Sequence, residues 1–259
     1  MTVSKIWLIT GSSRGLGRAL AESVLAAGDK LIATARDVSQ LDDLPRRFGD
    51  AVRLVPLDVA DPGAAFARAE AKLTQALSSS PDHARGHAFF GYVKILTKRA
   101  VEGIAECEHA LALDRNLADA HAYIGLGKIF TGRAEEAEGH INDALRLSPR
   151  DMSAYAWLTE AAIAKNHLGE CEQAVLWCRR AIEANRNYPE AHFHLATALA
   201  RLGRLDEARS AVKSGLALNP SFTVSRAVIN WTAMSDDPIH PQQLAPIFEG
   251  LRMAGLPEQ

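Results

Sequence analysis

The chain has 259 residues, of which 47% are hydrophobic and 23% are charged, a balance typical of a soluble protein that buries a core in one or two domains. This composition excludes disordered and collagen-like chains. There are 29 Lys and Arg residues against 31 Asp and Glu residues, a formal net charge of -2. No basic block is available to follow a phosphate backbone, so we expect no nucleic-acid partner.

No apolar stretch approaches the roughly 18 residues that a membrane span needs. The opening segment, MTVSKIWLITG, reads as a strand and a turn where a signal peptide would have its apolar region. We therefore expect a cytoplasmic protein without a membrane partner. Three cysteines, Cys107, Cys171 and Cys178, are too few and too widely spaced for a disulfide framework or a Cys-x-x-Cys metal site. We expect buried thiols and no bound metal.

Residues 1–65 alternate short apolar runs with helical segments. Strands are predicted over residues 5–10, 30–35 and 52–58, separated by one helix that ends near Ala27 and another over residues 38–48. Apolar runs that do not alternate indicate parallel strands covered on both faces. A further helix, over residues 61–77, is predicted to belong to both parts of the chain.

Residues 66–220 repeat themselves. One small residue recurs at spacings of 34, 34, 37 and 34 residues, at Ala76, Ala110, Ala144, Ala181 and Gly215. The period predicts a half unit followed by four helix-turn-helix units. The three extra residues of the third unit are predicted to lengthen its first helix by about one turn, near residues 161–167.

Small residues also recur at the eighth and twentieth positions of the units, where they let paired helices approach closely. They are Gly91, Gly125 and Ala196 at the eighth position and Ala137, Ala174 and Ala208 at the twentieth. This pattern resembles the tetratricopeptide repeat, which implies a superhelix whose first helices line a groove for a protein or peptide partner. The repeats also resemble the helical region C-terminal to some bacterial class III adenylate cyclases, although no cyclase domain is present.

A glycine-rich turn, TGSSRGLG, joins the first predicted strand to the first helix. Gly11 allows a tight turn, Gly15 lets the backbone approach a pyrophosphate, and Gly17 lets the helix pack on the sheet. The helix N-terminus supplies unpaired N–H donors to the anion. The turn resembles that of the short-chain dehydrogenase/reductase family, as do Arg36 after the second strand and the Leu-Asp-Val sequence at residues 57–59.

This second resemblance implies a dinucleotide site that favours NADP(H) over NAD(H). In that family an acidic residue after the second strand would bind the ribose 2′-hydroxyl, whereas Arg36, helped by Arg14, suits a 2′-phosphate. Asp58 and the backbone of Val59 would lie against the adenine. The predicted cofactor-binding residues are Gly11, Ser13, Arg14, Gly15, Leu16, Gly17, Arg36, Asp58 and Val59.

The catalytic motifs of that family are missing. None of the four tyrosines is followed four residues later by a Lys, which would lower the pKa of the phenol for proton transfer. The Asn-Asn-Ala-Gly stretch is also missing, and only three of the family's strands are predicted. We therefore predict no catalytic residue, and we expect the first strand to become an exposed apolar edge.

Three histidines, His87, His121 and His192, share one position of the repeat, which Tyr155 takes in the third unit. Equivalent positions lie about one repeat apart along a solenoid, too far to share one ion, so we interpret these side chains as partly buried packing residues.

The sequence thus predicts an α+β chain in two parts. Residues 1–65 form a truncated Rossmann βαβαβ unit, residues 66–220 an all-α tetratricopeptide-repeat superhelix, and residues 221–259 capping helices. The predicted function is a non-catalytic protein-interaction scaffold with an NADP(H)-binding unit that is either vestigial or ligand-sensing. The alternatives are an NADP-dependent oxidoreductase of the short-chain type with a non-standard proton donor, and a product of recombination with no selected role.

Overall fold

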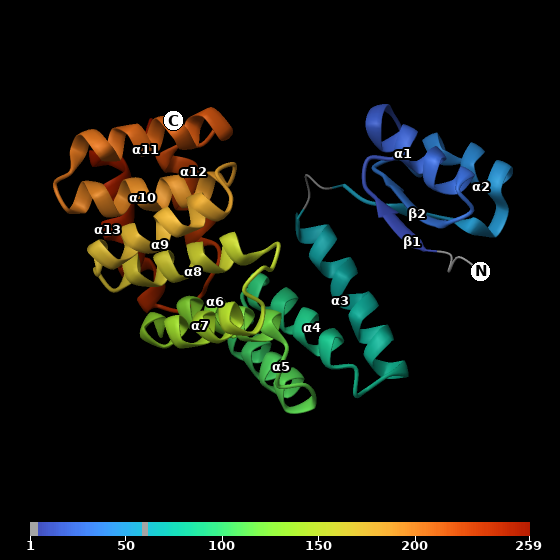
Figure 1. Ribbon diagram of the computed structural model, residues 1–259, viewed down its shortest axis with the longest axis horizontal. Coiled ribbons are helices and arrows are strands. Elements are labelled where there is room, and N and C mark those ends of the chain that lie inside the picture. The colour runs from blue at the N-terminus through green and yellow to red at the C-terminus, as the bar shows by residue number, and fades with distance from the viewer. Residues whose placement is uncertain (1–4, 59–61) are drawn as a thin grey trace. The chain divides into compact units, whose positions relative to one another are not determined.

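The computed structural model describes residues 5–58 and 62–259 (Figure 1). The chain divides into two compact units, Met1–Ala69 and Glu70–Gln259. The division falls inside one continuous helix, α3 (Pro62–Ser79), which is the helix predicted over residues 61–77. Among the described residues, no helix combines the length and the apolar character that crossing a membrane requires.

The first unit contains a parallel three-stranded sheet in the order β1-β2-β3. The strands are β1 (Ile6–Ile9), β2 (Lys30–Ala35) and β3 (Val52–Pro56). The first connection is α1 (Gly15–Ala26), and the second contains α2 (Asp43–Phe48) between two short 3-10 helices, Val38–Leu41 and Gly49–Ala51. The predicted βαβαβ order is confirmed.

One side of this sheet carries the core of the first unit. Leu31 and Ala33 on β2 pack against Ala21, Val24 and Leu25 on α1, and all five are buried. Successive side chains of a strand point to opposite sides of a sheet. The residues of β1 and β3 that pair with Leu31 and Ala33 therefore lie on the same side of the sheet as α1. This packing holds α1 against the strands and places its N-terminus beside the end of β1.

The first strand is the exposed apolar edge that the sequence predicts. Ile6 is 70% exposed, Leu8 64% and Trp7 39%, and β1 pairs with β2 alone among the described strands. The expectation that strands are covered on both faces is wrong for β1. Ile6 and Leu8 lie on the side of the sheet opposite to Leu31, so the α1 packing does not cover them.

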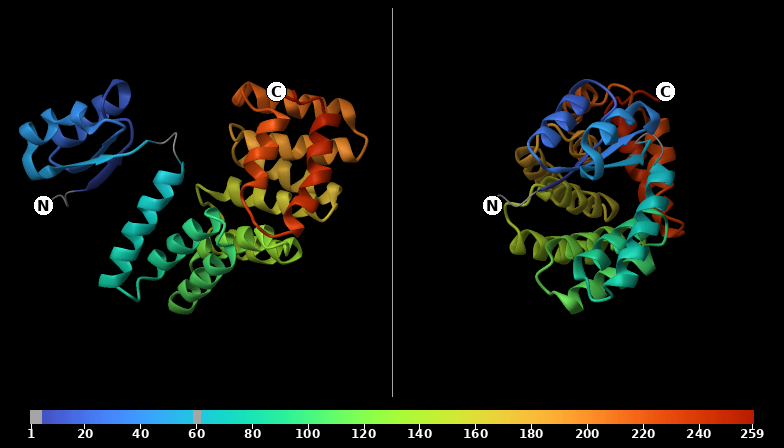
Figure 2. Two further views of the ribbon diagram at one scale, coloured as in Figure 1. Left: turned by 180° about the vertical axis from the view of Figure 1, so that it is seen from behind. Right: turned by 90° about the vertical axis from the view of Figure 1, so that its right-hand side faces the viewer.

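The second unit is an array of helix pairs in sequence order (Figures 1 and 2). The pairs are α4 (Ala84–Leu96) with α5 (Ala100–Leu113), α6 (Ala118–Phe130) with α7 (Ala137–Leu147), α8 (Ala154–His167) with α9 (Cys171–Ala184), and α10 (Pro189–Arg201) with α11 (Leu205–Leu218). The first helices also contact one another, α4 with α6, α6 with α8 and α8 with α10. We call these four helices the inner layer.

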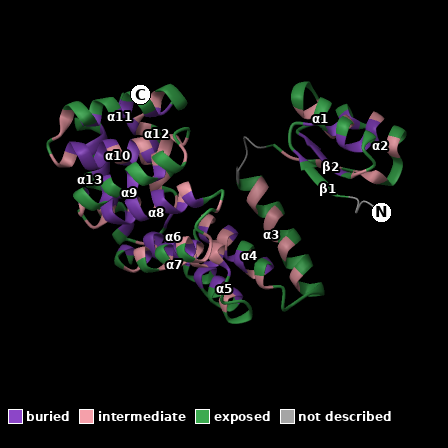
Figure 3. Ribbon diagram, viewed as in Figure 1, coloured by how far each residue is buried: buried purple, intermediate pink, exposed green. Residues whose placement is uncertain are grey.

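Small residues set the distance between paired helices. A Cβ atom added to Gly91 on α4 would lie 2.5 Å from the carbonyl oxygen of Gly103 and 2.5 Å from the sulfur of Cys107, both on α5. A Cβ atom added to Gly215 would lie 2.6 Å from the ring of Phe193. Figure 3 shows the buried residues gathered in these stacked helices, whereas none of the described side chains of α3 is buried.

The cysteines are buried as predicted, whereas the extra residues of the third unit shift its first helix along the chain more than they lengthen it. All three cysteines are buried free thiols, and burial raises the pKa of Cys107 to about 12. Ala120 and Ala191 lie ten residues before the ends of α6 and α10, whereas the equivalent Ala154 lies thirteen residues before the end of α8. However, α8 also begins two residues later relative to this alanine, so it has 14 residues against 13 in α6 and α10, and the prediction of a helix longer by about one turn is wrong.

Two further helices follow the last pair, α12 (Val224–Thr232) and α13 (Ile239–Met253). Both contribute to the core around α10, as expected of capping helices. In addition, α13 covers part of the inner layer, which the sequence pattern does not predict. Thr197 on α10 donates a hydrogen bond to the carbonyl of Ile247 at 3.3 Å, and Gln243 lies 3.1 Å from the ring nitrogen of His167 at the end of α8.

Substituting Gly91 by Ala tests whether the close approach of α4 and α5 is needed. Because the new Cβ would meet backbone and sulfur atoms, we expect the free energy of unfolding in urea to fall by about 1–3 kcal/mol. Gly139 on α7 is the matched control, since a Cβ there meets nothing within 4 Å. Gly139→Ala should stabilise the protein by about 0.5–1 kcal/mol. Equal effects at the two sites would show that the helix contact is not the constraint.

Candidate functional site

The glycine turn between β1 and α1 is shaped to receive an anion. Gly11 and Gly15 have φ angles of +65° and +59°, and added Cβ atoms there would point into open space. A Cβ on Gly17 would lie 2.4 Å from the carbonyl oxygen of Gly11, so only glycine allows α1 to begin this close to the turn. No side chain caps the N-terminus of α1, which leaves its first N–H groups available.

The turn is held in place by Ser12, which is fully buried. Its hydroxyl donates a hydrogen bond to the carbonyl of Ile9 at 2.7 Å, and its backbone N–H donates to the carbonyl of Thr34 at 2.9 Å. These two bonds join the turn to the ends of β1 and β2. They anchor the buried part of the loop although its tip is exposed.

Next to the turn lies a depression of about 390 Å³. Its lining residues are Ser13, Arg14, Arg36, Asp37 and Gln40. Three of them are predicted cofactor-binding residues, and they come from two loops that follow neighbouring strands. Two exposed guanidinium groups at one depression make a site for an anionic group such as a phosphate.

The other predicted cofactor-binding residues have different settings. Leu16 is 86% exposed, on the first turn of α1. Asp58 is exposed, two residues after β3, and Val59 lies outside the described residues. Sequence reasoning missed Asp37 and Gln40, although Asp37 is the second residue after β2 and directly follows Arg36. The Asp37 carboxylate accepts hydrogen bonds from the N–H and the hydroxyl of Ser39.

This region fits the phosphate and adenosine end of a dinucleotide. The glycine turn offers space and N–H donors, and Arg14 and Arg36 offer positive charge. The nicotinamide end has no equivalent support in the first unit, because the sheet ends at the exposed strand β1.

A second candidate site lies on the inner layer of the repeats. It consists of Tyr92 on α4, Tyr123 on α6, Glu160 on α8 and Tyr188, which immediately precedes α10. We call these four residues the tyrosine-glutamate cluster. The rings of Tyr92 and Tyr123 are stacked with centroids 4.2 Å apart. Burial above all, together with the charge of Glu160, raises the pKa of all three tyrosines.

Glu160 is an unusual feature of this cluster. The residue is only partly exposed, and its Oε2 atom is buried without a hydrogen-bond partner in the described part of the chain. Burial raises the pKa of its carboxyl group to about 8, because removal from water disfavours the charged form. The sequence analysis did not single it out. The available clue was its register, since Glu160 follows the eighth position of its unit, where the first unit has Tyr92.

The surroundings of the cluster are also acidic. Burial raises the pKa of Asp119 on α6 and of Glu190 on α10. Asp119 directly precedes Ala120, and Glu190 directly precedes Ala191. The two acidic residues therefore occupy equivalent positions near the starts of two inner helices. A half-buried surface with tyrosine rings and carboxyl groups is suited to a cationic ligand.

Comparison with known proteins supports the repeat array. The tetratricopeptide repeat family profile matches residues 177–210. The structure is similar to that of PilF from Pseudomonas aeruginosa, with a TM-score of 0.56 and 19% sequence identity, over 74% of this chain and 80% of that one. At this identity the likeness concerns the fold alone. The second unit thus has the fold of tetratricopeptide repeats.

The curated relatives are oxidoreductases that match over short stretches. Oxidoreductase BOA17 of Botryotinia fuckeliana is 42% identical over 99 residues, 38% of this chain and 31% of that protein. The 3-oxoacyl-[acyl-carrier-protein] reductase FabG of Salmonella typhimurium is 41% identical over 58 residues, 22% of this chain and 24% of that protein. The chain therefore spans less than a third of the length of these two relatives.

The raised pKa of Glu160 predicts a specific pH dependence of stability. Between about pH 4.5 and pH 8 the folded state keeps a proton that the unfolded state has lost, so the wild type loses stability as the pH rises through this window. Glu160→Gln cannot ionise. The melting temperature of this variant, minus that of the wild type, should therefore increase from pH 5 to pH 8 in differential scanning calorimetry.

Glu183→Gln is the control for this experiment, because Glu183 is exposed on α9 of the same unit. Its difference from the wild type should change little over the same range. A difference for Glu160→Gln that stays constant from pH 5 to pH 8 would mean that this carboxyl group titrates normally.

Proposed function

We propose that this protein is a non-catalytic scaffold that binds a partner peptide through a Lys or Arg side chain placed at the tyrosine-glutamate cluster. The N-terminal unit of this scaffold binds NADP(H). The observation that carries the proposal is the half-buried carboxyl group of Glu160, whose Oε2 atom has no hydrogen-bond partner among the described residues.

A cationic side chain matches what this carboxyl group lacks. A buried polar atom without a partner carries a free-energy cost, and a charged partner removes it. Tyrosine rings attract a cation through the negative charge on their faces, and Tyr92 and Tyr123 provide two stacked rings nearby. The acidic neighbours Asp119 and Glu190 favour a positively charged ligand over a negatively charged one.

The position of α13 supports a ligand of limited length. Contacts at Thr197 and His167 place α13 over the inner layer of the third and fourth units. The cluster draws Tyr92, Tyr123 and Glu160 from α4, α6 and α8, and Tyr188 directly precedes α10, so the surface of the cluster is built by neighbouring units. A peptide segment bound there needs to cross only these neighbouring helices.

The proposal that the scaffold is non-catalytic rests on the distribution of proton donors. All four tyrosines lie in the second unit, away from the glycine turn in sequence. Burial raises the pKa of Tyr92, Tyr123 and Tyr188, which opposes a role in proton transfer near neutral pH.

For the N-terminal unit, Gly11, Ser13, Gly15 and Gly17 would surround the pyrophosphate, and Arg14 and Arg36 would hold the 2′-phosphate. Asp58 and Val59 would contact the adenine, and Leu16 would contact the bound nucleotide from the first turn of α1. When bound, the dinucleotide carries redox chemistry that this scaffold does not use. We infer that residues 1–65, 66–220 and 221–259 act as nucleotide-binding, partner-binding and capping segments.

Peptide pools test the preference for a cation. We expect nonapeptides of random sequence with a fixed central Lys or Arg to bind about 10-fold more tightly than pools with central Leu or Glu, by fluorescence anisotropy, since a hydrogen bond to a charged group contributes about 1.5–3 kcal/mol. Glu160→Gln should remove this preference, and Glu183→Gln should keep it. Equal binding of all pools by the wild type would contradict the proposal.

The same binding event should release a proton. At pH 7 the empty Glu160 site holds a proton, because its pKa is raised to about 8, and a bound cation stabilises the ionised form. Calorimetric titration of a Lys-centred peptide in phosphate and in Tris should therefore give binding enthalpies that differ by about the difference between the protonation enthalpies of the two buffers, because about one proton passes to the buffer. In the Glu160→Gln variant the two enthalpies should coincide.

Calorimetric titration of the full-length protein with NADPH and then NADH tests the nucleotide site. We expect NADPH to bind in the micromolar range and NADH about 10-fold or more weakly, since only NADPH offers the charge that Arg36 would pair with. Arg36→Glu should abolish the difference. Arg46→Glu, the same charge change at an exposed residue of α2, is the control. No NADPH binding at millimolar concentration would mean that the turn is a remnant of ancestry.

A further inference from the structure

Three metal-ligating side chains converge where α4 packs on α5. They are His87 on α4 and Glu106 and His109 on α5, and one ligand atom from each lies within 4.8 Å of the other two. Glu106 and His109 are three residues apart, so they share one face of their helix. The distance between repeats argues against a shared ion for His87 and His121. It does not apply to these three residues, because they belong to a single repeat unit.

The geometry at His87 requires a positive charge. Its Nε2 atom lies 2.7 Å from the carbonyl oxygen of Pro81, and a carbonyl can only accept, so Nε2 carries the hydrogen. Its Nδ1 atom lies 2.8 Å from Oε2 of Glu106, which is also an acceptor when ionised. With neutral His87, two lone pairs would face each other at 2.8 Å. A proton must lie between these two atoms, or the pair must open to admit a metal ion.

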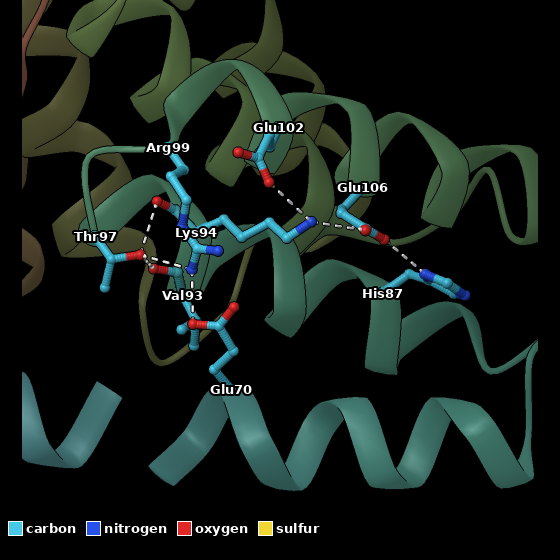
Figure 4. A network of polar contacts seen from close by, with 8 residues as sticks. All are labelled: Glu70, His87, Val93, Lys94, Thr97, Arg99, Glu102 and Glu106. Carbon is cyan, nitrogen blue, oxygen red and sulfur yellow. Dashed lines mark hydrogen bonds and ion pairs between the residues drawn. The ribbon is translucent and has the colours of Figure 1, made fainter. Parts of the chain in front are cut away.

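The groups around these atoms hold them as metal ligands are usually held. Metal-binding histidines commonly donate their second ring N–H to a backbone carbonyl, which fixes the tautomer and the ring orientation. For His87 the carbonyl of Pro81 is this acceptor. Lys94 lies 3.1 Å from the other oxygen of Glu106, Oε1, and 3.4 Å from Glu102. Figure 4 shows this chain of contacts from His87 through Glu106 to Lys94. Oε2 is thereby left directed at His87.

His109 distinguishes a metal ion from a proton. The rings of His87 and His109 are stacked with centroids 4.3 Å apart. A protonated His87 paired with Glu106 makes no use of this second ring. A metal ion does, because the exposed His109 side chain can turn a ring nitrogen toward it as a third ligand. Two imidazoles and one carboxylate form a donor set typical of Zn²⁺ and neighbouring divalent ions.

We propose that His87 Nδ1, Glu106 Oε2 and His109 bind one divalent transition-metal ion, Zn²⁺ or an ion of similar preference, with water completing the coordination. Binding requires the Nδ1 atom of His87 and the Oε2 atom of Glu106, which are 2.8 Å apart, to separate to about 3.3 Å around a tetrahedral ion. His109 makes the main adjustment, because it is exposed and must turn a ring nitrogen toward the ion. The ion joins α4 to α5 at the first complete repeat. This site shares no residue with the glycine turn or the tyrosine-glutamate cluster, and it does not depend on either proposal.

The other repeats provide an internal comparison. His192, in the same register as His87, has the same kind of bond, from its Nε2 atom to the carbonyl of Arg186 at 3.1 Å. However, Ala211 and Ser214 take the register positions of Glu106 and His109. The fourth unit therefore has the oriented histidine without its two partners, which makes His192 a matched control.

Calorimetric titration of the full-length, untagged protein with ZnCl₂ tests the proposal. We expect one ion per chain with a micromolar or lower dissociation constant and a rise in melting temperature that EDTA reverses. His109→Ala removes an exposed ligand and should leave the fold intact by circular dichroism, while weakening Zn²⁺ binding about 10-fold or more. Glu106→Gln should do the same, and His192→Ala should bind as the wild type does.

Cobalt provides a second readout that does not depend on affinity alone. Co²⁺ at the site should give visible absorption bands of a tetrahedral nitrogen and oxygen environment, and these bands should change in His109→Ala but not in His192→Ala. The proposal is overturned if the wild type binds no Zn²⁺, which would leave an imidazolium-carboxylate pair only. It is also overturned if His109→Ala and His192→Ala weaken binding equally.

Discussion

The close approach of paired helices is the constraint on which the second unit depends. Gly91 leaves no space for even one additional carbon atom between α4 and α5, and Gly125 and Ala196 are the small residues at the equivalent position of the second and fourth units. The first helices also come into contact along the array. Residues about 34 positions apart in sequence thereby become neighbours in one layer. The tyrosine-glutamate cluster and the stacking of Tyr92 on Tyr123 are consequences of this packing rather than of any local motif.

The first unit follows a different constraint. A parallel sheet requires a crossover after each strand, and α1 and α2 supply two such crossovers for three strands. The glycine turn needs only β1, α1 and the end of β2, so its geometry is complete within the unit. The exposure of Ile6 and Leu8 on β1 is the cost of ending the sheet there. The glycine turn thus depends on local segments alone, whereas among the described residues no further strand extends the sheet beyond β1.

Features encoded by local spacing could be predicted from the sequence, and features that arise from packing between distant segments could not. The strands and the helix pairs follow from apolar periodicity and from the register of small residues, whereas the predicted lengthening of α8 by about one turn does not occur. Within the predicted nucleotide site, Ser13, Arg14 and Arg36 meet at one depression because two loops follow adjacent strands. The return of α13 over α10 depends on Gly250 meeting Thr197, a contact between residues 53 positions apart in the sequence. The burial of Glu160 likewise depends on neighbouring units, so its changed pKa has no signature in its own helix.

The repeats also separate the demands of packing from those of chemistry. Positions that pack one helix on another require similar residues in every unit, as Ala110, Ala144 and Ala181 illustrate. Where one register position carries different chemistry in different units, packing alone does not explain the choice. The position after the eighth residue holds Tyr92, Leu126, Glu160 and Thr197 in turn, and the fold uses the last of these against α13. The partners of the register histidines vary in the same way, from Glu106 and His109 beside His87 to Ala211 and Ser214 beside His192. The backbone around these positions is repeated from unit to unit. Residues that differ at one register position therefore indicate a contact or a function that belongs to a single unit.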